Sequence, residues 1–281
     1  MITIISALPQ PVMNQWYDLC GQVLLERYGM TEIGMALSNS YLPVNRRLPG
    51  HVGKPLPFVE VRIVSGDADK GESEVEIHRM SGDDLWHKVP EPSSHVSETA
   101  SAFATKDAHA ADEESDSAAG ELRVRGPAVF KEYLNKAQFT KESFDNDGWF
   151  KTGDVVVFNK KEQAYRILGR ASSDVIKSAG YKLSSLEIER EILSYPPVKD
   201  CAVVGVPDEA LGQALVAVIC LNRASGRSDD EETASLAEFL SARLARYKRN
   251  FKKVVFVNAL PRNAMGKVNK KNLLNDLGIA A

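Results

Sequence analysis

The sequence predicts an α/β protein built in two parts, on three observations. Short apolar runs rich in β-branched residues recur along the chain, which is typical of buried strands. Between them lie stretches whose apolar residues repeat at helical spacing. The alternation is most regular after residue 170, where it indicates a small α/β domain with its own core. A length of 281 residues leaves room for two ordinary domains.

The first part begins with a predicted strand and a predicted helix. Residues 2–5 form an apolar β-branched run, and Pro9 and Pro11 favour a helix start directly after it. A hairpin is predicted around Asn159 to Lys161, between two apolar runs. The predicted strands cover residues 2–5, 59–63, 122–124, 155–158 and 164–168. The apolar face of the helix comprises Val12, Trp16, Leu19, Cys20 and Val23.

The second part alternates strands and helices. Ser184 and Glu187 have the spacing of a capping box, so a helix is predicted to begin there and to end before Pro196. Further strands are predicted over residues 201–206, 214–221 and 254–257. Two more helices are indicated by Leu236, Phe239, Leu240 and Leu244, and by Leu273, Leu274 and Leu277.

Composition and charge exclude several classes of function. A net charge of −3 gives no basis for nucleic acid as a partner. No stretch approaches the roughly 18 apolar residues of a membrane span. The three cysteines, Cys20, Cys201 and Cys220, form no CxxC spacing, so neither a zinc site nor a disulfide framework is predicted.

An acidic segment, residues 66–119, interrupts the first part. It contains 14 Asp and Glu against 4 Lys and Arg, and it has little periodicity apart from one strand expected over residues 73–78. This composition predicts a disordered insertion. Four of the five histidines fall here, but their irregular spacing favours ordinary side chains over a metal site.

The first block with the character of a site is Tyr28-Gly29-Met30-Thr31-Glu32. One interpretation is purely structural: a strand ends in a turn that Thr31 caps. The alternative is a nucleotide site, in which Tyr28 stacks on a base, Thr31 bonds a phosphate oxygen and Gly29 lets the backbone approach. Glu32 would hold Mg²⁺, which prefers few carboxylates together with phosphate oxygens.

The second block, Gly148 to Asp154, reads GWFKTGD. Asp154 is suited to accept hydrogen bonds from both hydroxyls of a ribose, because a carboxylate presents two acceptor oxygens. Trp149 and Phe150 are predicted to be core residues. Arg170 follows a strand and a glycine, and on its own it would be assigned to a surface ion pair.

Two further blocks complete a recognisable pattern, Asp174 to Lys182 (DVIKSAGYK) and Pro261 to Lys267 (PRNAMGK). In their order and spacing the blocks resemble the adenylate-forming acyl-CoA synthetase superfamily, over nearly the whole chain outside the acidic segment. The resemblance implies that residues 1–170 are the C-terminal part of the large adenylating domain. Residues 171–281 would be the complete, mobile small C-terminal domain. The family's phosphate-binding loop, rich in Ser, Thr and Gly and ending in Lys, has no counterpart in the sequence.

The resemblance implies a two-step reaction of an acid–thiol ligase. A carboxylate attacks the α-phosphorus of ATP and gives an acyl-adenylate and pyrophosphate; the small domain then rotates, and the thiol of CoA displaces AMP. The implied cofactors are ATP or AMP, Mg²⁺ and CoA, and the implied partners are a small carboxylic acid and CoA. Lys267 would bridge the acyl carboxylate and the α-phosphate, where charge grows in the transition state. The implied nucleotide and magnesium residues are Tyr28, Gly29, Thr31, Glu32, Asp154, Arg170 and Lys267, of which Thr31, Glu32 and Lys267 count as catalytic.

In the family, the block from Asp174 to Lys182 approaches the thiol arm of CoA. Alternatively, Gly180 is only a turn residue, and Lys177 and Lys182 are only solvent-exposed side chains. One residue more than usual separates Arg170 from this block, so the hinge falls on Ser172 or Ser173, small residues that can absorb a backbone rotation. The residues implied in this second step are Lys177, Gly180, Tyr181 and Lys182.

Within the superfamily, residues 25–37, 47–53 and 176–182 are most similar to malonyl-CoA synthetases. A short diacid needs a cation for its second carboxylate, and Arg47, beside Arg46, is one candidate; a surface arginine in a turn is the alternative. The resemblance implies the mitochondrial matrix, although the sequence shows no targeting segment, and otherwise the cytoplasm. Oligomeric state is not predicted.

Two functions of different classes remain open. The first is a truncated ligase that is weak or inactive by itself, because the phosphate-binding loop lies outside the sequence. The second is a non-catalytic protein that keeps a nucleotide-binding or partner-binding surface. The presence of Lys267, Asp154 and Glu32 favours the first.

Overall fold

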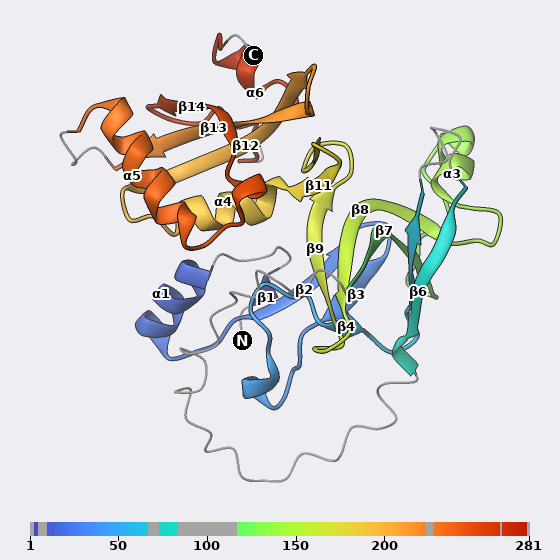
Figure 1. Ribbon diagram of the computed structural model, residues 1–281. Helices are drawn as coiled ribbons and strands as arrows, with labels where there is room; N and C mark the ends of the chain where they lie inside the picture. Colours follow the sequence, from blue (N-terminus) through green and yellow to red (C-terminus); the bar gives the residue numbers. More distant parts are fainter. Residues whose placement is uncertain are drawn as a thin grey trace. The chain divides into compact units, whose positions relative to one another are not determined.

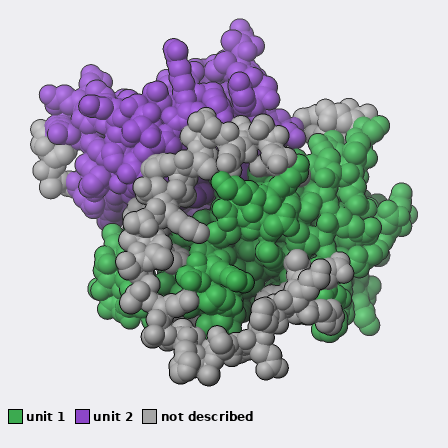
Figure 2. Space-filling model, turned by 60° about the horizontal axis from the view of Figure 1, so that its bottom comes forward, with its two compact units in different colours: residues 1–167 green, residues 168–281 purple. Residues whose placement is uncertain are grey.

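The computed structural model describes residues 3–4, 10–66, 73–83, 117–222, 227–264 and 266–279. The chain forms two compact units, Met1–Ile167 and Leu168–Ala281, which are coloured separately in Figure 2. Both units combine helices with strands, as the predicted α/β class requires.

The first sheet of unit 1 has four strands in the order β1-β2-β3-β4 (Figure 1). β1 pairs parallel with β2, and β2 leads through a tight turn into the antiparallel β3. A bulge between Tyr28 and Gly29 interrupts the β2–β3 register. A Cβ on Gly29 would lie 2.2 Å from the Gly34 carbonyl oxygen, so only glycine fits this close approach. The elements are β1 (Thr3–Ile4), helix α1 (Gln10–Cys20), β2 (Leu25–Met30), β3 (Gly34–Ser38), the 3₁₀ helix η1 (Val44–Arg46) and β4 (Lys54–Pro55).

The second sheet of unit 1 has five strands in the order β6-β5-β7-β8-β9. Its β7–β8 pairing contains a bulge, because Glu121 pairs with Val155 and Arg123 pairs with Lys151. Residues 152–154 therefore lie opposite a single residue of β7. Bulges of this kind re-aim side chains, and this one contains Asp154. The elements are β5 (Glu60–Ser65), β6 (Val75–Ser81), β7 (Ser117–Arg125), helix α3 (Ala137–Ser143), β8 (Phe150–Asn159) and β9 (Ala164–Arg170).

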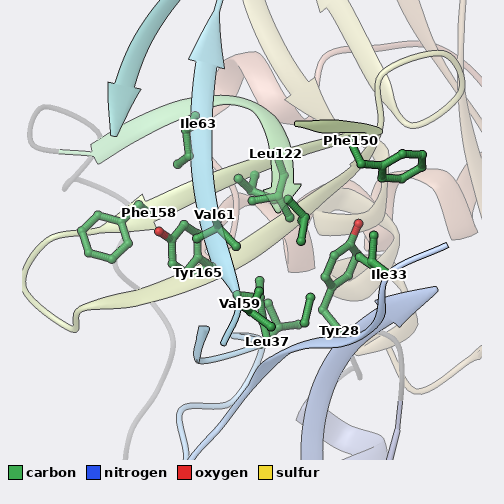
Figure 3. Close-up of a cluster of buried hydrophobic side chains, with 14 residues drawn as sticks. Tyr28, Ile33, Leu37, Val59, Val61, Ile63, Leu122, Phe150, Phe158 and Tyr165 are labelled. Carbon is green, nitrogen blue, oxygen red and sulfur yellow. The ribbon is translucent and has the colours of Figure 1, made fainter. Parts of the chain in front are cut away.

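Both sheets of unit 1 contribute to one apolar core (Figure 3). Alternate residues of β5, Val61 and Ile63, are fully buried in it, as the predicted two-residue periodicity requires. Phe150 belongs to this cluster and Trp149 is buried outside it, so both side chains are buried as predicted. Figure 3 shows the ring of Tyr28 beside Ile33 at one end of this cluster.

The opposite face of the second sheet carries a buried charge cluster centred on Arg123, which is 2% exposed. The guanidinium of Arg123 pairs with the carboxylates of Glu74, Glu121 and Asp145. Asp145 also pairs with Arg62 and accepts the backbone N–H of Trp149. Burial alone would raise the pKa of Asp145, but the Trp149 N–H and the two guanidinium groups hold it below its usual value.

Unit 2 is built around one five-stranded sheet in which β13 pairs with β10, β12 and β14. The β13–β14 pairing is parallel and the others are antiparallel. The strands are β10 (Val175–Ser178), β11 (Tyr181–Ser184), β12 (Val198–Asp208), β13 (Gly212–Leu221) and β14 (Phe251–Val257). The helices are α4 (Ser185–Leu193), α5 (Asp229–Ser241), the 3₁₀ helix η5 (Arg246–Lys248) and α6 (Leu273–Asp276).

Both faces of the unit 2 sheet are covered, which explains the near-continuous apolar runs in β12 and β13. Odd-numbered residues such as Val203 and Ala217 pack against α4 and α5. Even-numbered residues such as Val204 and Val218 pack against α6 and the segment before it, on the other face (Figure 1).

Two local expectations need correction. Helix α1 buries Met13 and exposes Leu19 and Cys20, because helical spacing alone does not tell which stripe a neighbouring surface will cover. The acidic segment is partly ordered: β6 confirms the strand expected near residues 73–78, and β7 begins at Ser117. The remaining expected disorder, at residues 67–72 and 84–116, falls outside the described residues.

The helix starts follow capping rules. Ser184 accepts the N–H of Glu187 and so caps α4 as predicted, while the complete capping box forms at Ser228 and Glu231, at the start of α5. Across the described ranges, none of the helices is both long and apolar enough to cross a membrane.

The charge cluster predicts that Asp145→Asn destabilises unit 1. The substitution leaves Arg62 and Arg123 without a shared anion, so we expect a loss of about 3–5 kcal/mol in the free energy of unfolding. Since the pKa of Asp145 is lowered in the folded state, its contribution is present above about pH 4 and is lost as the pH falls through the folded-state pKa. Urea unfolding followed by tryptophan fluorescence, at pH 7 and in acid, measures both effects, since all three tryptophans lie within residues 1–167.

The matched control is Asp147→Asn, whose carboxylate is 73% exposed. Equal urea midpoints for Asp145→Asn and Asp147→Asn at pH 7 would contradict the structural role of the cluster.

Candidate functional site

Unit 1 brings Tyr28 and Asp154 together, although they lie 126 residues apart. The Tyr28 hydroxyl donates a hydrogen bond of 2.5 Å to Asp154 Oδ2. Such a short O–H···O⁻ bond is typical of a charge-assisted pair. Asp154 is 7% exposed, and the β8 bulge, where Gly153 has a φ of 71°, directs it toward β2.

The ring of Tyr28 is also buried, at 8% exposure, within the unit 1 core. Its surroundings favour a supporting role, in which the ring packs and the hydroxyl orients Asp154. Stacking of Tyr28 on a base stays a prediction. Gly29 also fits the structural interpretation, because a side chain at this position would clash with β3 across the β2–β3 hairpin.

The turn after β2 carries Thr31, which is exposed, and Glu32, which is half-buried. Glu32 Oε1 accepts the hydroxyl of Tyr133 at 2.9 Å, and its backbone carbonyl accepts the N–H of Phe130 at 2.7 Å. The turn is thereby tied to the segment after β7. The sequence did not predict the bond between Tyr133 and Glu32.

A magnesium ion held through Glu32 would need most of its oxygen ligands from phosphate and water. Among the residues that the structure describes, no three His, Cys, Asp or Glu side chains gather as a metal site. A single partly exposed carboxylate fits the usual environment of Mg²⁺ bound with a nucleotide. His78, the described histidine of the acidic segment, instead stacks on Phe158 with ring centroids 3.8 Å apart.

Arg47 lies in an environment that differs from both sequence interpretations. It is 6% exposed, and its guanidinium donates to the backbone carbonyls of Val23, Ser40 and Tyr41 at 2.5, 3.0 and 3.0 Å. Arg47 therefore holds the loop after β3 against the start of β2. A role in binding a substrate carboxylate stays a prediction that these contacts do not favour.

In unit 2, Arg170 begins a tight turn whose centre is formed by Ser172 and Ser173. The carbonyl of Arg170 accepts the N–H groups of Ser173 and Asp174, and the N–H of Arg170 donates to Asp174 Oδ2 at 3.0 Å. A Cβ on Gly169 would lie 2.3 Å from the Asp174 Cβ, so glycine is required before Arg170. The arginine side chain itself is exposed.

The predicted thioester-step residues lie on the hairpin of β10 and β11. Its two-residue turn, Ala179-Gly180, has φ values of 49° and 84°, the positive pair of a type I′ turn. Lys177 and Lys182 are exposed and face each other in register across the hairpin. Tyr181 is half-exposed and stacks on Tyr247 at 4.4 Å.

Lys267 ends the loop that follows β14, and its side chain is exposed. The loop is closed by its own backbone, since Asn263 donates to the Lys267 carbonyl at 2.9 Å and Gly266 donates to the Asn263 carbonyl at 2.8 Å. The Lys267 N–H donates a hydrogen bond to Asn263 Oδ1 at 2.9 Å. Arg262 pairs with Asp200 on β12 and anchors the start of the loop.

The sequence missed a buried ionic cluster directly after this loop. Lys270 Nζ lies 2.8 Å from Asp174 Oδ1, Glu189 Oε1 and Ser185 Oγ. Burial alone would lower the pKa of Lys270, but the two carboxylates raise it, so the amine stays charged. Ser185 and Glu189, four residues apart on α4, were the available signal for a polar patch on this helix.

The chain matches two family models and is similar to malonate--CoA ligases. Residues 1–77 match the family described as AMP-binding enzyme, and residues 187–267 match the AMP-binding enzyme C-terminal domain. Malonate--CoA ligase ACSF3, mitochondrial, of Bos taurus is 45% identical over 99% of this chain and 42% of its own length. Malonate--CoA ligase of Arabidopsis thaliana is 38% identical over 97% of this chain and 38% of its own length.

Solved structures agree with these relatives. ATP-bound MatB from Rhodopseudomonas palustris superposes with a TM-score of 0.67 at 31% identity, over 95% of this chain and 43% of MatB. The chain therefore spans less than half the length of each of these relatives and of this structure.

The type I′ turn predicts opposite effects for its two residues. Gly180→Ala should cost about 1–2 kcal/mol of the free energy of unfolding, because an L side chain is strained at this φ even though a Cβ would meet open space. Ala179→Gly relieves the same strain and should stabilise by up to about 1 kcal/mol. Urea unfolding followed by circular dichroism measures both, and effects of equal sign would contradict the turn.

Proposed function

Because the chain belongs to the AMP-binding enzymes, we propose that it acts in the ATP-dependent joining of a small carboxylic acid to CoA. The proposed acid is malonate, which two of the relatives carry in their names. The observation that supports the proposal most directly is the bond between Tyr28 and Asp154, because it joins the two separate sequence blocks that were assigned to a nucleotide.

In the proposed first step, the substrate carboxylate attacks the α-phosphorus of ATP and pyrophosphate leaves. Asp154 would accept the ribose hydroxyls, Thr31 would bond a phosphate oxygen, and Glu32 would hold the Mg²⁺ that neutralises the phosphates. The buried position of Asp154 supports this role, since a fixed acceptor needs no reorganisation when the ribose binds. Lys267 would place its ammonium between the acyl carboxylate and the α-phosphate, and its exposed side chain is available for this.

In the proposed second step, the thiol of CoA attacks the acyl carbon and AMP leaves. The β10–β11 hairpin, with Lys177, Gly180, Tyr181 and Lys182, would approach the thiol arm after a rotation about Ser172 or Ser173. The open space beside Gly180 supports a close approach of ligand to backbone. Arg170 would meet the ribose or a phosphate.

The cofactors of this proposal are ATP or AMP, Mg²⁺ and CoA. The proposed location is the mitochondrial matrix, on the basis of relatives whose names include that organelle. The chain spans 42% of the length of the bovine relative, so we propose that turnover needs the remaining part of the adenylating domain as well. The alternative is a protein that binds a nucleotide or a partner without catalysis.

The proposal is tested by a chimera in which this chain replaces the matching segment of the bovine malonate--CoA ligase. We expect malonate-dependent exchange between ATP and pyrophosphate, together with formation of malonyl-CoA. Lys267→Ala should lower the exchange rate by about 10²–10³-fold, because it removes a charge that acts in the transition state. Asp154→Asn should instead raise the KM for ATP.

The matched control is Lys271→Ala, since Lys271 is exposed and lies only four residues from Lys267. A folded chimera with no malonate-dependent exchange would contradict the proposed activity, and full activity of Lys267→Ala would contradict the catalytic assignment. Calorimetric AMP binding to the 281-residue chain, with no turnover in the chimera, would support the non-catalytic alternative.

A further inference from the structure

We propose that Lys270 is a positioning residue: its ammonium fastens the Lys267 loop to Asp174, the residue directly after the proposed hinge, so that the loop moves together with the chain that follows the hinge. Its consequence for catalysis rests on the proposed function. The coupling itself is a property of unit 2 and can be tested without activity.

The contacts of Lys270 match the bonding capacity of an ammonium group. A lysine has three N–H donors, and three acceptors lie 2.8 Å from Nζ: Asp174 Oδ1, Glu189 Oε1 and Ser185 Oγ. The side chains of Lys270 and Glu189 are each 12% exposed, and that of Asp174 is 15% exposed. Such a shielded ion pair resists screening by salt and is costly to break from one side.

Each acceptor is itself fixed to a different part of the unit. Asp174 receives the N–H of Arg170 through its second carboxylate oxygen, at 3.0 Å. Glu189 receives the N–H of Val203, on strand β12, at 2.7 Å. Ser185, the first residue of α4, donates its N–H to the Asp174 carbonyl at 2.8 Å. The ammonium therefore joins the turn, the helix and the sheet at one point.

The Lys267 loop has one strong attachment on each side. Arg262 holds its start through Asp200, and Lys270 holds its end, three residues beyond Lys267. Between these points the loop is closed by hydrogen bonds within itself, at Asn263 and from Arg262 Nη1 to the Gly266 carbonyl. Loss of the Lys270 attachment should leave the position of Lys267 poorly defined, even with the strands of unit 2 intact.

The consequence for the reaction concerns rotation at the hinge. Asp174 is the residue directly after Ser173, where the rotation is proposed. Because the Lys270 ammonium ties Asp174 to the Lys267 loop, the loop would move together with Asp174 when the chain rotates at the hinge. Lys267 would then be withdrawn from the first step as the β10–β11 hairpin is brought in for the second.

Amide hydrogen exchange of the 281-residue chain tests the coupling. The reporters are the amides of Asn263, Gly266 and Lys267 in the loop, and of Ser173 and Asp174 in the turn. Lys270→Met should speed exchange in both groups by about tenfold or more, because bonds to a charged group are lost. Lys270→Arg keeps the charge and should restore exchange to within about threefold of the wild type.

Asp174→Asn is the decisive second variant, because it leaves the loop sequence untouched. It should speed exchange at the loop amides, although Asp174 and Lys270 lie 96 residues apart. The control Lys271→Met should leave both groups unchanged, and unchanged amides in β12 and β13 show that each variant is folded.

Faster exchange in the turn alone after Asp174→Asn would overturn the proposal, as would equal behaviour of Lys270→Met and Lys271→Met. If Lys270→Met unfolds the chain, Asp174→Asn and Lys270→Arg still decide between these outcomes. Positive exchange results combined with an inactive chimera would refute the proposed ligase function and leave the coupling standing.

Discussion

The candidate site of unit 1 depends on the hydrogen bond between the Tyr28 hydroxyl and the Asp154 carboxylate. The two residues come from different sheets, β2 of the first and β8 of the second, and both are more than nine-tenths buried. Two backbone irregularities make the contact geometrically accessible: the bulge before Gly29 in β2 and the bulge at residues 152–154 in β8. In a regular strand, successive side chains point alternately to the two faces of the sheet. The bulges change these directions locally, which helps to bring the two groups together.

Unit 2 also has a shielded charged group that joins distant segments, but this group is an ammonium and not a carboxylate. There a buried ammonium, Lys270, gathers two carboxylates and a hydroxyl from three segments, whereas in unit 1 a carboxylate receives a neutral hydroxyl. The same glycine-dependent backbone occurs beside both. Gly29 and Gly169 each approach a neighbour more closely than any Cβ would allow. Glycines in the recognisable blocks thus shape the backbone around polar side chains, in addition to any approach to a ligand.

The sequence predicted β12, β13, β14 and the helices α4, α5 and α6 of unit 2, because strand runs of β-branched residues and helix caps are local signals, but it did not predict the β10–β11 hairpin. It also identified the order of the site blocks. It did not predict that Tyr28 would be buried, that Arg47 would bond backbone carbonyls, or that Lys270 would contact Asp174, Glu189 and Ser185. Each of these depends on partners distant in sequence, and nothing in the local pattern of a single tyrosine, arginine or lysine encodes them. The exposed stripe of α1 was mispredicted for the same reason.

A double-mutant cycle on the free energy of unfolding tests most directly whether the Tyr28–Asp154 bond is formed and specific. Tyr28→Phe, Asp154→Asn and the double variant are unfolded in urea, with Tyr17→Phe as a control for loss of a hydroxyl on α1. We expect a coupling energy of about 1–3 kcal/mol between Tyr28 and Asp154. Additive effects, with a coupling near zero, would contradict it.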